Sequence, residues 1–456
     1  MKLILISMAV ASVLFGCDGL NSEKKEHGKH SAMPASEWSE SQLLDTVQYQ
    51  TFNYFWDGAE PTSGLARERI HMDSIYPTHD RNIITTGGSG FGLMAILVGV
   101  ERGFISRDQA VERLEKAVDF LARADRFHGA WPHWLTPEGK VAPFSAKDDG
   151  GDLVETAFLV QGLLTVKEYF EGGSEREQQL ADRIQQLWEE IEWDWYTKGG
   201  EDVLYWHWSP QHGWDMNFPV GGYNEALIMY VLAAASPTHP VSKEVYEKGW
   251  ALNGKIAEDT TYYGLDTELN HYEHDAAPVG PLFWAHYSYL GLDPNGLSDQ
   301  YGDYWKLNRN HALIHYRHSL ENPQGYKGYG KNLWGLTSSY SMKGYAGHRP
   351  DKDLGVISPT AALSSMPYTP EESKQFLRYM YSEQDSLIGR FGPYDAFSVE
   401  EGWSLPRYLA IDQGPIPVMI ENYRSGLLWK HFMKNKDLHN GLRRLGFKSP
   451  YLKEDE

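Results

Sequence analysis

Carboxylate side chains gather in three short segments that contain glycine or proline, and each segment runs into an apolar stretch. Asp148, Asp152 and Glu155 occupy the first segment, Glu225 the second and Asp412 the third. Carboxyl groups in such a cluster can donate and accept protons in catalysis. They can equally cap the first turn of a helix, which stabilises it by up to about 1 kcal/mol, and for any single acid capping is the more common role.

The grouping of these acids favours a functional cluster. Asp148, Asp152 and Glu155 follow one another at intervals of four and three residues, so they can project from one face as the chain enters a helix. Glu225 is followed by the apolar run ALIMYVLAAA (226–235), which predicts that it lies on a buried helix. Because burial of a carboxylate is costly, it requires a reason. We therefore expect an acid-lined cleft.

Aromatic residues near these acids have the composition of a sugar-binding cleft, in which rings stack on C–H faces and hydroxyls bond to acids and amides. A lone tryptophan is more often a core residue, but several here lie in segments rich in Gly, Pro or His: Trp131, Trp134, Trp206, Trp208, Trp214, Trp334 and Trp403. The substrate-binding side chains that we predict are Trp131, His133, Trp134, Trp214, Asn217, Tyr223, Lys331, Trp334 and Tyr394. Segment 319–355 is too long for a simple connection and is expected to form a lid or wall.

Other motifs carry no chemistry in this interpretation. The glycine-rich run at 87–92 has neither a preceding strand nor a P-loop lysine, so phosphate or dinucleotide binding is not expected. His271, His274 and Asp275 lack a recurring zinc-type spacing and are better explained by a hydrogen-bonded loop. We predict neither a metal nor a cofactor.

Hydrophobic periodicity predicts the helices that must position these residues. Alternate predicted helices are two-faced and charged, whereas those between them are apolar on nearly every side. Buried helices covered by amphipathic ones predict an all-α protein, an (α/α)6 toroid of six inner and six outer helices, with the inner helices starting at one rim. The predicted ranges are 38–56, 89–102, 106–125, 152–171, 173–192, 221–235, 240–256, 279–291, 300–317, 357–365, 370–384 and 413–433.

The composition supports a large folded unit and excludes some partners. Of 456 residues, 41% are hydrophobic and 13% aromatic, which excludes a disordered chain. The formal net charge of −20 disfavours nucleic acids and acidic polysaccharides as partners. We expect a single catalytic domain over 38–450, acting as a monomer on a neutral ligand.

The amino terminus has the pattern of a bacterial export signal. Residues 1–16 carry one lysine and then an apolar stretch that ends at a small residue, just before Cys17. This end resembles a lipobox, which predicts lipidation of Cys17 and a flexible tether over 17–37. The alternative is an ordinary secretory peptide with an incidental cysteine. No later stretch reaches the roughly 18 apolar residues of a membrane span, so we expect a lipoprotein of the bacterial cell envelope, held to the membrane by its lipid alone.

Ordered blocks along the chain resemble the bacterial glucoamylase-like family, glycoside hydrolase family 144, whose known members act on β-1,2-glucan. The blocks include FHGAWPHW (127–134), DDGGDLVETAF (148–158), GWDMNFPVGGYNEALIMYVLAAASPTHPV (213–241), YGKNLWGLTSSYSMKGY (329–345) and AIDQGPIPVMIENYRSGLLW (411–429), out of several spread over 51–430. The resemblance implies an (α/α)6 fold and hydrolysis with inversion.

The resemblance also assigns roles to the acids. It implies that Glu225 is the general acid, that Asp412 is the general base, and that Asp148, Asp152 and Glu155 support the site. The catalytic carboxyls of an inverting enzyme stand roughly 6.5–9.5 Å apart, or farther where a substrate hydroxyl relays the proton, as the resemblance implies here. An acid must hold its proton at neutral pH, so burial has to outweigh the helix dipole at Glu225, whereas Asp412 is expected to stay ionised without conflict.

Two other functions fit parts of the sequence. A cell-envelope lipoprotein that binds glycans without cleaving them would need the aromatic residues and not the acids. A polysaccharide lyase on a similar toroid would need basic groups or a metal to neutralise uronates, which an acid-lined cleft supplies poorly.

Overall fold

A computed structural model describes residues 34–271 and 279–452 of the protein. The predicted signal peptide (1–16), the lipidation site Cys17, residues 17–33 of the predicted tether, and His274 and Asp275 lie outside the described residues. None of the helices within the described ranges combines the length and the apolar character that crossing a bilayer requires.

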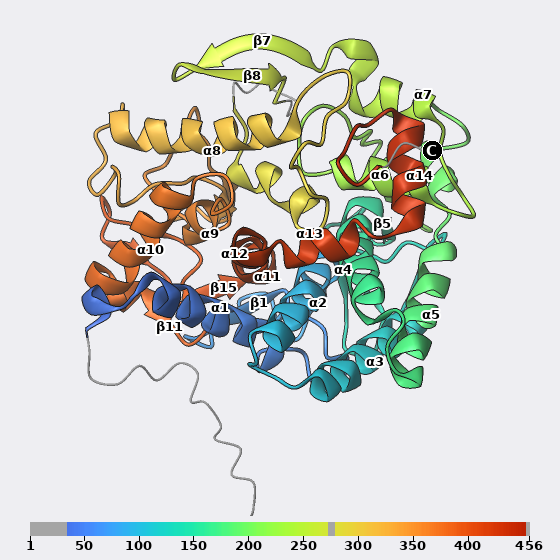
Figure 1. Ribbon diagram of the computed structural model, residues 1–456, viewed down its shortest axis with the longest axis horizontal. Helices are drawn as coiled ribbons and strands as arrows, with labels where there is room; N and C mark the ends of the chain where they lie inside the picture. The colour runs from blue at the N-terminus through green and yellow to red at the C-terminus, as the bar shows by residue number, and fades with distance from the viewer. Residues whose placement is uncertain (1–33, 272–278, 453–456) are drawn as a thin grey trace, which may run out of the picture.

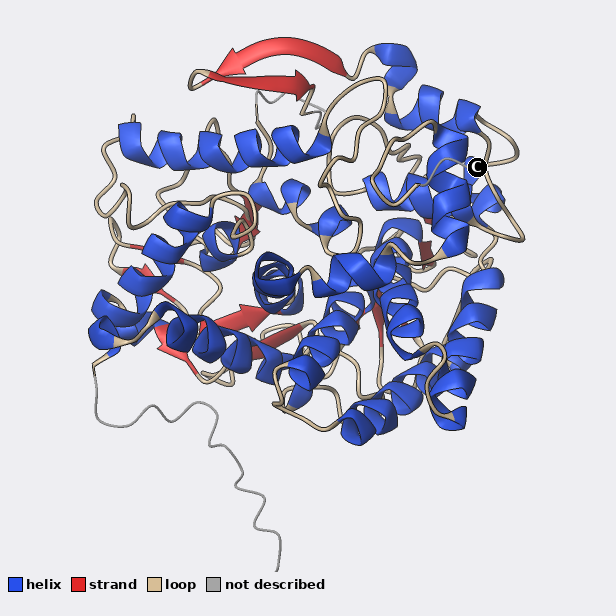
Figure 2. Cartoon of the chain, viewed as in Figure 1, coloured by secondary structure: helices blue, strands red, loops and turns tan. Residues whose placement is uncertain are grey.

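The described chain is mostly helical (Figure 1, Figure 2). The α-helices are α1 (Glu40–Trp56), α2 (Thr86–Glu101), α3 (Arg107–Arg123), α4 (Leu153–Phe170), α5 (Glu175–Glu189), α6 (Leu227–Ala235), α7 (Lys243–Val245), α8 (Tyr304–Glu321), α9 (Pro359–Leu363), α10 (Pro370–Glu383), α11 (Ala410–Gln413), α12 (Pro415–Ser425), α13 (Leu427–Phe432) and α14 (Lys436–Leu445). Shorter turns of helix are η1 (Ala35–Glu37), η2 (Trp193–Thr197), η3 (Tyr246–Trp250), η4 (Leu252–Gly254), η5 (Leu282–Ala285), η6 (Tyr287–Tyr289) and η7 (Asp385–Leu387).

Short antiparallel strand pairs connect the helices, so the expectation of an all-α chain is corrected to a mostly helical one. The pairs are β1 (Arg69–His71) with β15 (Arg407–Leu409), β5 (Gly151–Asp152) with β6 (His207–Trp208), β7 (Ala257–Tyr262) with β8 (Leu265–Leu269), β9 (Ser338–Ser339) with β10 (Ala346–Gly347), β11 (Ile388–Gly389) with β12 (Gly392–Pro393), and β13 (Phe397–Ser398) with β14 (Trp403–Ser404). A three-stranded sheet joins β2 (Ile84–Thr85), β3 (Trp134–Leu135) and β4 (Val141–Ala142).

The two kinds of helix that the periodicity predicts are both present. The amphipathic α3 begins at Ser106, whose side chain caps the helix, and it buries an apolar face that includes Leu114 and Leu121. Most residues of α2 and α4 are buried on every side, and these two helices pack against each other. Their backbones come close where Gly90 faces Gly162, since a Cβ at Gly162 would lie 2.2 Å from the Gly90 carbonyl oxygen.

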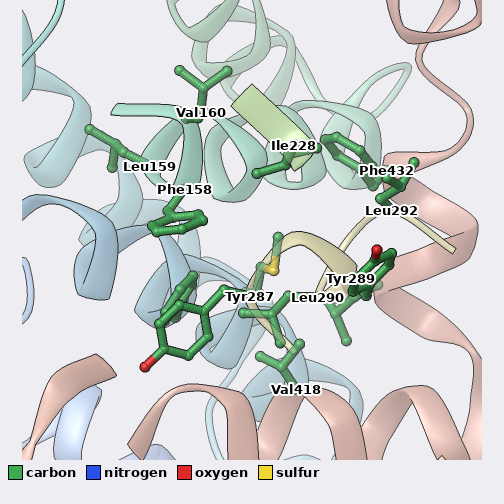
Figure 3. Packing of buried hydrophobic residues seen from close by; sticks show 14 of the residues in the cluster. Phe158, Leu159, Val160, Ile228, Tyr287, Tyr289, Leu290, Leu292, Val418 and Phe432 are labelled. Atoms are coloured by element: carbon green, nitrogen blue, oxygen red, sulfur yellow. The ribbon is translucent and has the colours of Figure 1, made fainter. Parts of the chain in front are cut away.

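One hydrophobic core runs through the described residues, from Leu43 to Phe447. The helix α12 lies near the centre of the view in Figure 1, with α1, α3, α5, α8 and α10 around the edge. Side chains from α4, α6, η6, α12 and α13 meet in this core (Figure 3): Phe158, Leu159, Val160, Ile228, Tyr287, Tyr289, Val418 and Phe432.

Several predicted helices are shorter in the structure, and one was missed. The predicted helix 221–235 begins only at Leu227, because Gly222 adopts a φ of 78° and the chain turns through Glu225. Within 279–291 only the short turns η5 and η6 form, after Pro281. The predicted helix 413–433 is divided at Gly426, which adopts a left-handed conformation, and α14 follows it unpredicted. These differences move Glu225 from a helix to the turn before one.

Candidate active site

A cavity of about 380 Å³ opens beside the amino-terminal ends of α4 and α6. Its wall combines aromatic rings, apolar side chains and a few polar groups, which is the composition of a site for a small organic ligand. The lining residues are His133, Phe144, Asp148, Trp206, Met216, Phe218, Pro219, Val220, Gly221, Asn224, Glu225, Phe283 and Trp284.

Glu225 lies in this wall, one residue before the cap of α6. Two side chains fix the turn that carries it. The Asn224 side-chain oxygen accepts a hydrogen bond from the Ala226 N–H at 2.9 Å, and the Ser288 hydroxyl donates to the Glu225 carbonyl oxygen. The same hydroxyl accepts from the Ile228 N–H at 3.0 Å, so Ser288 joins the turn to the first turn of α6. Glu225 is half-buried, so its expected full burial on a helix is corrected.

Asp152 organises the acid cluster at the start of α4. It is the N-cap of this helix, and its Oδ1 accepts from the Glu155 N–H at 2.9 Å. Its Oδ2 accepts from His133 Nδ1 and from Trp206 Nε1, both at 2.8 Å. A fully buried carboxylate is thus satisfied by three donors of the site, and capping and site support are combined in one residue.

Glu155, in the first turn of α4, reaches across to α2. Its Oε2 accepts a hydrogen bond from the Gly87 N–H at 2.8 Å, and its Oε1 lies 4.0 Å from His133 Nε2. A Cβ on Gly87 would lie 2.6 Å from the same Oε2, so glycine is required for this approach. Burial raises the pKa of Glu155 to about 7, although the charge of His133 and the Gly87 N–H act in the opposite direction.

His133 is the cation of this acid cluster. Burial alone would lower its pKa, but the negative charges of Glu155, Asp152 and Asp148 outweigh burial and raise the pKa of His133 to about 9. Its ring stacks on Phe144 with a centroid distance of 4.2 Å. A protonated His133 therefore balances part of the negative charge in the cavity at neutral pH.

Asp148 faces the second histidine of the cluster. One of its oxygens lies 3.3 Å from His207 Nε2, which also accepts from the Gly150 N–H at 3.2 Å. Burial and the charge of Asp152 raise the pKa of Asp148 to about 7. A ring nitrogen that accepts from Gly150 carries no proton of its own, so Asp148 can satisfy the contact as the donor when it is protonated.

Asp412 lies in α11, 1% exposed, and is not among the residues that line the 380 Å³ cavity. Both of its carboxyl oxygens are buried. Burial, then the charge of Asp395 and a hydrogen bond with it, raises the pKa of Asp412 well above its usual range. The expectation that Asp412 stays ionised without conflict is therefore corrected, and of the two predicted catalytic acids only Glu225 faces the cavity.

Tyr287 connects the two acids electrostatically. Burial raises its pKa, and the charges of Asp412, Glu155 and Glu225 raise it further. Tyr345, on the segment predicted to be a lid or wall, likewise has its pKa raised by desolvation of its hydroxyl and by the charge of Asp412. Its side chain is nevertheless 54% exposed. No residue of this segment lines the 380 Å³ cavity, so its expected role as a lid or wall stays a prediction.

Three predicted sugar-contacting residues are core residues, and this is a correction. Trp131 and Trp334 are 0% exposed and donate their indole N–H groups to the carbonyl oxygens of Leu121 and Glu372. Tyr223 is also fully buried and donates its hydroxyl to Asn308 at 2.6 Å. Each polar atom finds its partner inside the protein, so none of the three is free to contact a ligand.

The other predicted binding residues are not among those that line the cavity. Trp134 packs edge-on against Phe144 and Trp214 packs against Tyr205, whereas Tyr394 packs against Tyr408. The remaining two, Asn217 and Lys331, are exposed. Of the whole predicted binding set, His133 alone lines the cavity.

Sequence reasoning singled out Trp206, which lines the cavity, but it missed the rest of the aromatic wall and one buried acid. Phe283 and Trp284 line the cavity from η5, in a range that was predicted to be a regular inner helix. Pro281 and the two adjacent aromatic residues were the available signal for an irregular, ligand-facing turn. Asp395 lies between β12 and β13.

A metal could be considered at His133, Asp148 and Asp152, because one ligand atom from each lies within 4.8 Å of the others. However, Asp152 Oδ2 already accepts from two N–H groups, and His133 uses its Nδ1 for one of them. The hydrogen bonds of the site therefore fit a proton on His133 better than a metal ion.

Taken together, an aromatic-walled cavity with a carboxyl group at its edge is typical of proteins that act on carbohydrates. Residues 217–436 match a family described as "Putative glucoamylase". An endo-β-1,2-glucanase structure from Chitinophaga pinensis is 60% identical, with a TM-score of 0.89, and the match covers 91% of this chain and 100% of that one. The chain belongs to this glucoamylase-like family, glycoside hydrolase family 144.

Two further relatives support this assignment. A structure with the same glucoamylase description, from Bacteroides fragilis NCTC 9343, is 56% identical with a TM-score of 0.89, over 92% of this chain and 99% of that one. An exo β-1,2-glucooligosaccharide sophorohydrolase from Parabacteroides distasonis is 42% identical over 89% of this chain. The match spans only 58% of the length of that relative.

Proposed function

We propose that the protein hydrolyses β-1,2-glucan or its oligosaccharides, with Glu225 as the general acid. The observation that carries the proposal is the position of Glu225 in the wall of the 380 Å³ cavity, beside Phe283 and Trp284. Aromatic faces can stack on glucose rings while Glu225 reaches the oxygen between them. The linkage is taken from the names of relatives at 60% and 42% identity, a β-1,2-glucanase and a β-1,2-glucooligosaccharide hydrolase.

In the proposed mechanism Glu225 protonates the leaving oxygen while Asp412 accepts a proton from water through a substrate hydroxyl. A 1,2-linkage leaves the 3-hydroxyl of the sugar free for this relay. The transition state has oxocarbenium character, so the acid cluster of Asp148, Asp152 and Glu155 favours the positive charge that develops on the ring. Since Asp412 is buried in the unliganded protein, its part in the mechanism requires that bound substrate reaches it from the Tyr345 side.

Cleavage with inversion has a direct test. A β-linkage cleaved with inversion releases the α-anomer first, which proton NMR detects within the first minutes of hydrolysis of a β-1,2-glucan. If the β-anomer appears first, the enzyme retains the anomeric configuration instead of inverting it. A time course of product sizes separates the two activities named for the relatives, because mixed sizes indicate internal cleavage and one constant dimer indicates cleavage from a chain end.

A non-catalytic glycan-binding lipoprotein remains the competing function. It is favoured by the same aromatic wall, which needs no acid to bind sugar. Wild-type protein that binds β-1,2-glucan in calorimetry and releases no reducing ends would establish the binding function and exclude the hydrolase. An unsaturated product that absorbs in the ultraviolet would instead indicate a lyase.

The proposal extends to architecture and location. The helices form an (α/α)6 toroid in one domain over 38–450, which is supported by the packing of α2 against α4 and α12 and of α4 against α6. The protein is a monomer of the bacterial cell envelope, exported by residues 1–16 and lipidated at Cys17. Incorporation of a labelled fatty acid into the wild type and not into Cys17→Ser tests the lipidation, and light scattering tests the monomer.

A further inference from the structure

Two buried carboxyl groups, Asp395 and Asp412, lie together with fewer hydrogen-bond donors than oxygens. They are 3% and 1% exposed. Asp395 Oδ2 accepts from the Tyr340 N–H at 2.9 Å. The other oxygen of Asp395 and both oxygens of Asp412 are buried and accept no hydrogen bond from an N–H or O–H donor of the described residues. Each carboxyl is near enough to the other to act on its pKa, and a hydrogen bond between them would need one of them to hold a proton.

Elementary electrostatics explains the shared proton. Two ionised carboxylates close together inside a protein repel each other, and each unpartnered buried oxygen adds a desolvation cost. A single proton between them removes one charge and supplies the missing donor. The backbone holds Asp395 in place for this contact, because its N–H donates to the Arg407 carbonyl oxygen at 3.0 Å.

The charged and titratable groups around the pair do not supply the missing positive charge. Arg69 acts on Asp395, but its guanidinium is engaged by Glu68 and by Asp80, whose oxygen lies 3.1 Å away. Glu68 adds a negative charge that acts on Asp412. Two tyrosine hydroxyl groups are also close enough to interact with the pair, because the charge of Asp412 raises the pKa of both Tyr287 and Tyr345.

We infer that Asp395 is a positioning residue for Asp412: the two carboxyls share one proton, and Asp395 sets the pH at which Asp412 can act as a base. This inference rests on the proposed function. When the shared proton moves to Asp395, Asp412 is left ionised and can take a proton as the water O–H bond breaks. Glu225 meanwhile gives its proton to the leaving oxygen. After the step the pair holds two protons and releases one to solvent, and Glu225 is reprotonated.

The test replaces each carboxyl by an amide of the same shape. Asp395→Asn cannot hold the shared proton, and its amide N–H can donate to Asp412, which favours the ionised form. The acidic limb of the kcat/KM profile on β-1,2-glucan should therefore move by about one pH unit or more to lower pH. A purely structural role would reduce activity without moving this limb. Asp293→Asn, a buried carboxyl that accepts from Asn295 and Tyr451, is the matched control and should leave the limb in place.

Infrared difference spectra give a readout that does not depend on activity. At pH 8 the wild type should show a protonated carboxyl band that is lost in Asp395→Asn and equally in Asp412→Asn, and is kept in Asp293→Asn. A band and an acidic limb that are both unchanged in Asp395→Asn would overturn the inference and leave the proposed function intact. Full activity in Asp412→Asn would instead refute the base role, whatever the infrared result. Asp395→Ser replaces Asp395→Asn if circular dichroism shows that the amide variant does not fold.

Discussion

The contact between Gly87 and Glu155 joins the buried helix α2 to the acid cluster at the start of α4, and Gly87→Ala tests it. The added Cβ would lie 2.6 Å from Glu155 Oε2 and 3.0 Å from a ring carbon of Phe158. Glu155 must then move, which breaks its 2.8 Å hydrogen bond with the Gly87 N–H. A bond to a charged group contributes about 1.5–3 kcal/mol and overpacking costs about 1–3 kcal/mol, whereas alanine gains about 1 kcal/mol over glycine in a helix.

These contributions predict that Gly87→Ala lowers the free energy of unfolding by about 2–4 kcal/mol. The measurement is urea unfolding at pH 8, followed by tryptophan fluorescence. In a Glu155→Ala background the bond is already absent and the space is open, so the same substitution should cost little beyond the Phe158 contact. The double-mutant cycle should therefore give a coupling of about 2 kcal/mol. Additive losses would show that Gly87 and Glu155 do not act on each other and would refute this part of the account.

Three further predictions follow from the site. The folded-state pKa values of Glu155 and His133, about 7 and about 9, lie above the ordinary values of these side chains, so the folded protein binds more protons than the unfolded chain. The free energy of unfolding, measured by urea titration, should therefore fall as the pH rises from about 4.5 to 9. A rise over that range would contradict the assigned charges. Trp131→Phe should destabilise the protein by about 1–3 kcal/mol and leave the Kd for a β-1,2-gluco-oligosaccharide unchanged, because Trp131 is a core residue. Weaker binding without loss of stability would show that Trp131 contacts the ligand. Phe283→Ala should weaken that binding by about tenfold in calorimetry, since a stacked aromatic ring contributes about 0.5–1.5 kcal/mol in addition to the burial of its apolar surface. Unchanged affinity would show that η5 does not contact the ligand.

Local signals in the sequence were sufficient for the start of α4. Asp152 and Glu155 are three residues apart at the entrance to an apolar stretch, and this spacing alone places one as the cap and the other in the first turn. The capping bond from the Glu155 N–H to Asp152 lies within one turn of the chain, so this bond needed little beyond helix geometry. The same holds for α2 and α4, whose apolar character on every side predicts their burial.

The tryptophans show why residue type and segment composition do not separate a binding residue from a core residue. Trp131 lies in the predicted aromatic segment, yet its indole N–H donates to a carbonyl oxygen at the end of α3, ten positions earlier in the chain. That partner becomes visible only when the segment is folded back on the helix. Phe283 was overlooked for the opposite reason, because a regular helix was expected where a short turn presents its ring.

The contact between Asp395 and Asp412 was equally beyond sequence reasoning. Asp412 was expected to stay ionised without conflict, since a general base acts in its ionised form. The acid that acts on it, Asp395, precedes the strands β13, β14 and β15 in the chain, whereas Asp412 follows them. The Tyr340 N–H donates a hydrogen bond to Asp395 and so helps to hold it in place. The pKa of a buried acid depends on residues that packing brings near it from distant parts of the chain. Hydrophobic periodicity does not reveal those residues, so it could not predict how readily Asp412 acts as a base.

The central claim is that Glu225 is the acid of a glycoside hydrolase site, and Glu225→Gln tests it most directly. Initial rates of reducing-end release from β-1,2-glucan should be measured for the wild type and the variant at the same pH, with calorimetric binding of a β-1,2-gluco-oligosaccharide as the control. The account predicts a loss of about 10²–10⁴-fold in rate with the oligosaccharide still bound. A variant that cleaves as fast as the wild type, or a wild type that binds and never cleaves, would contradict it.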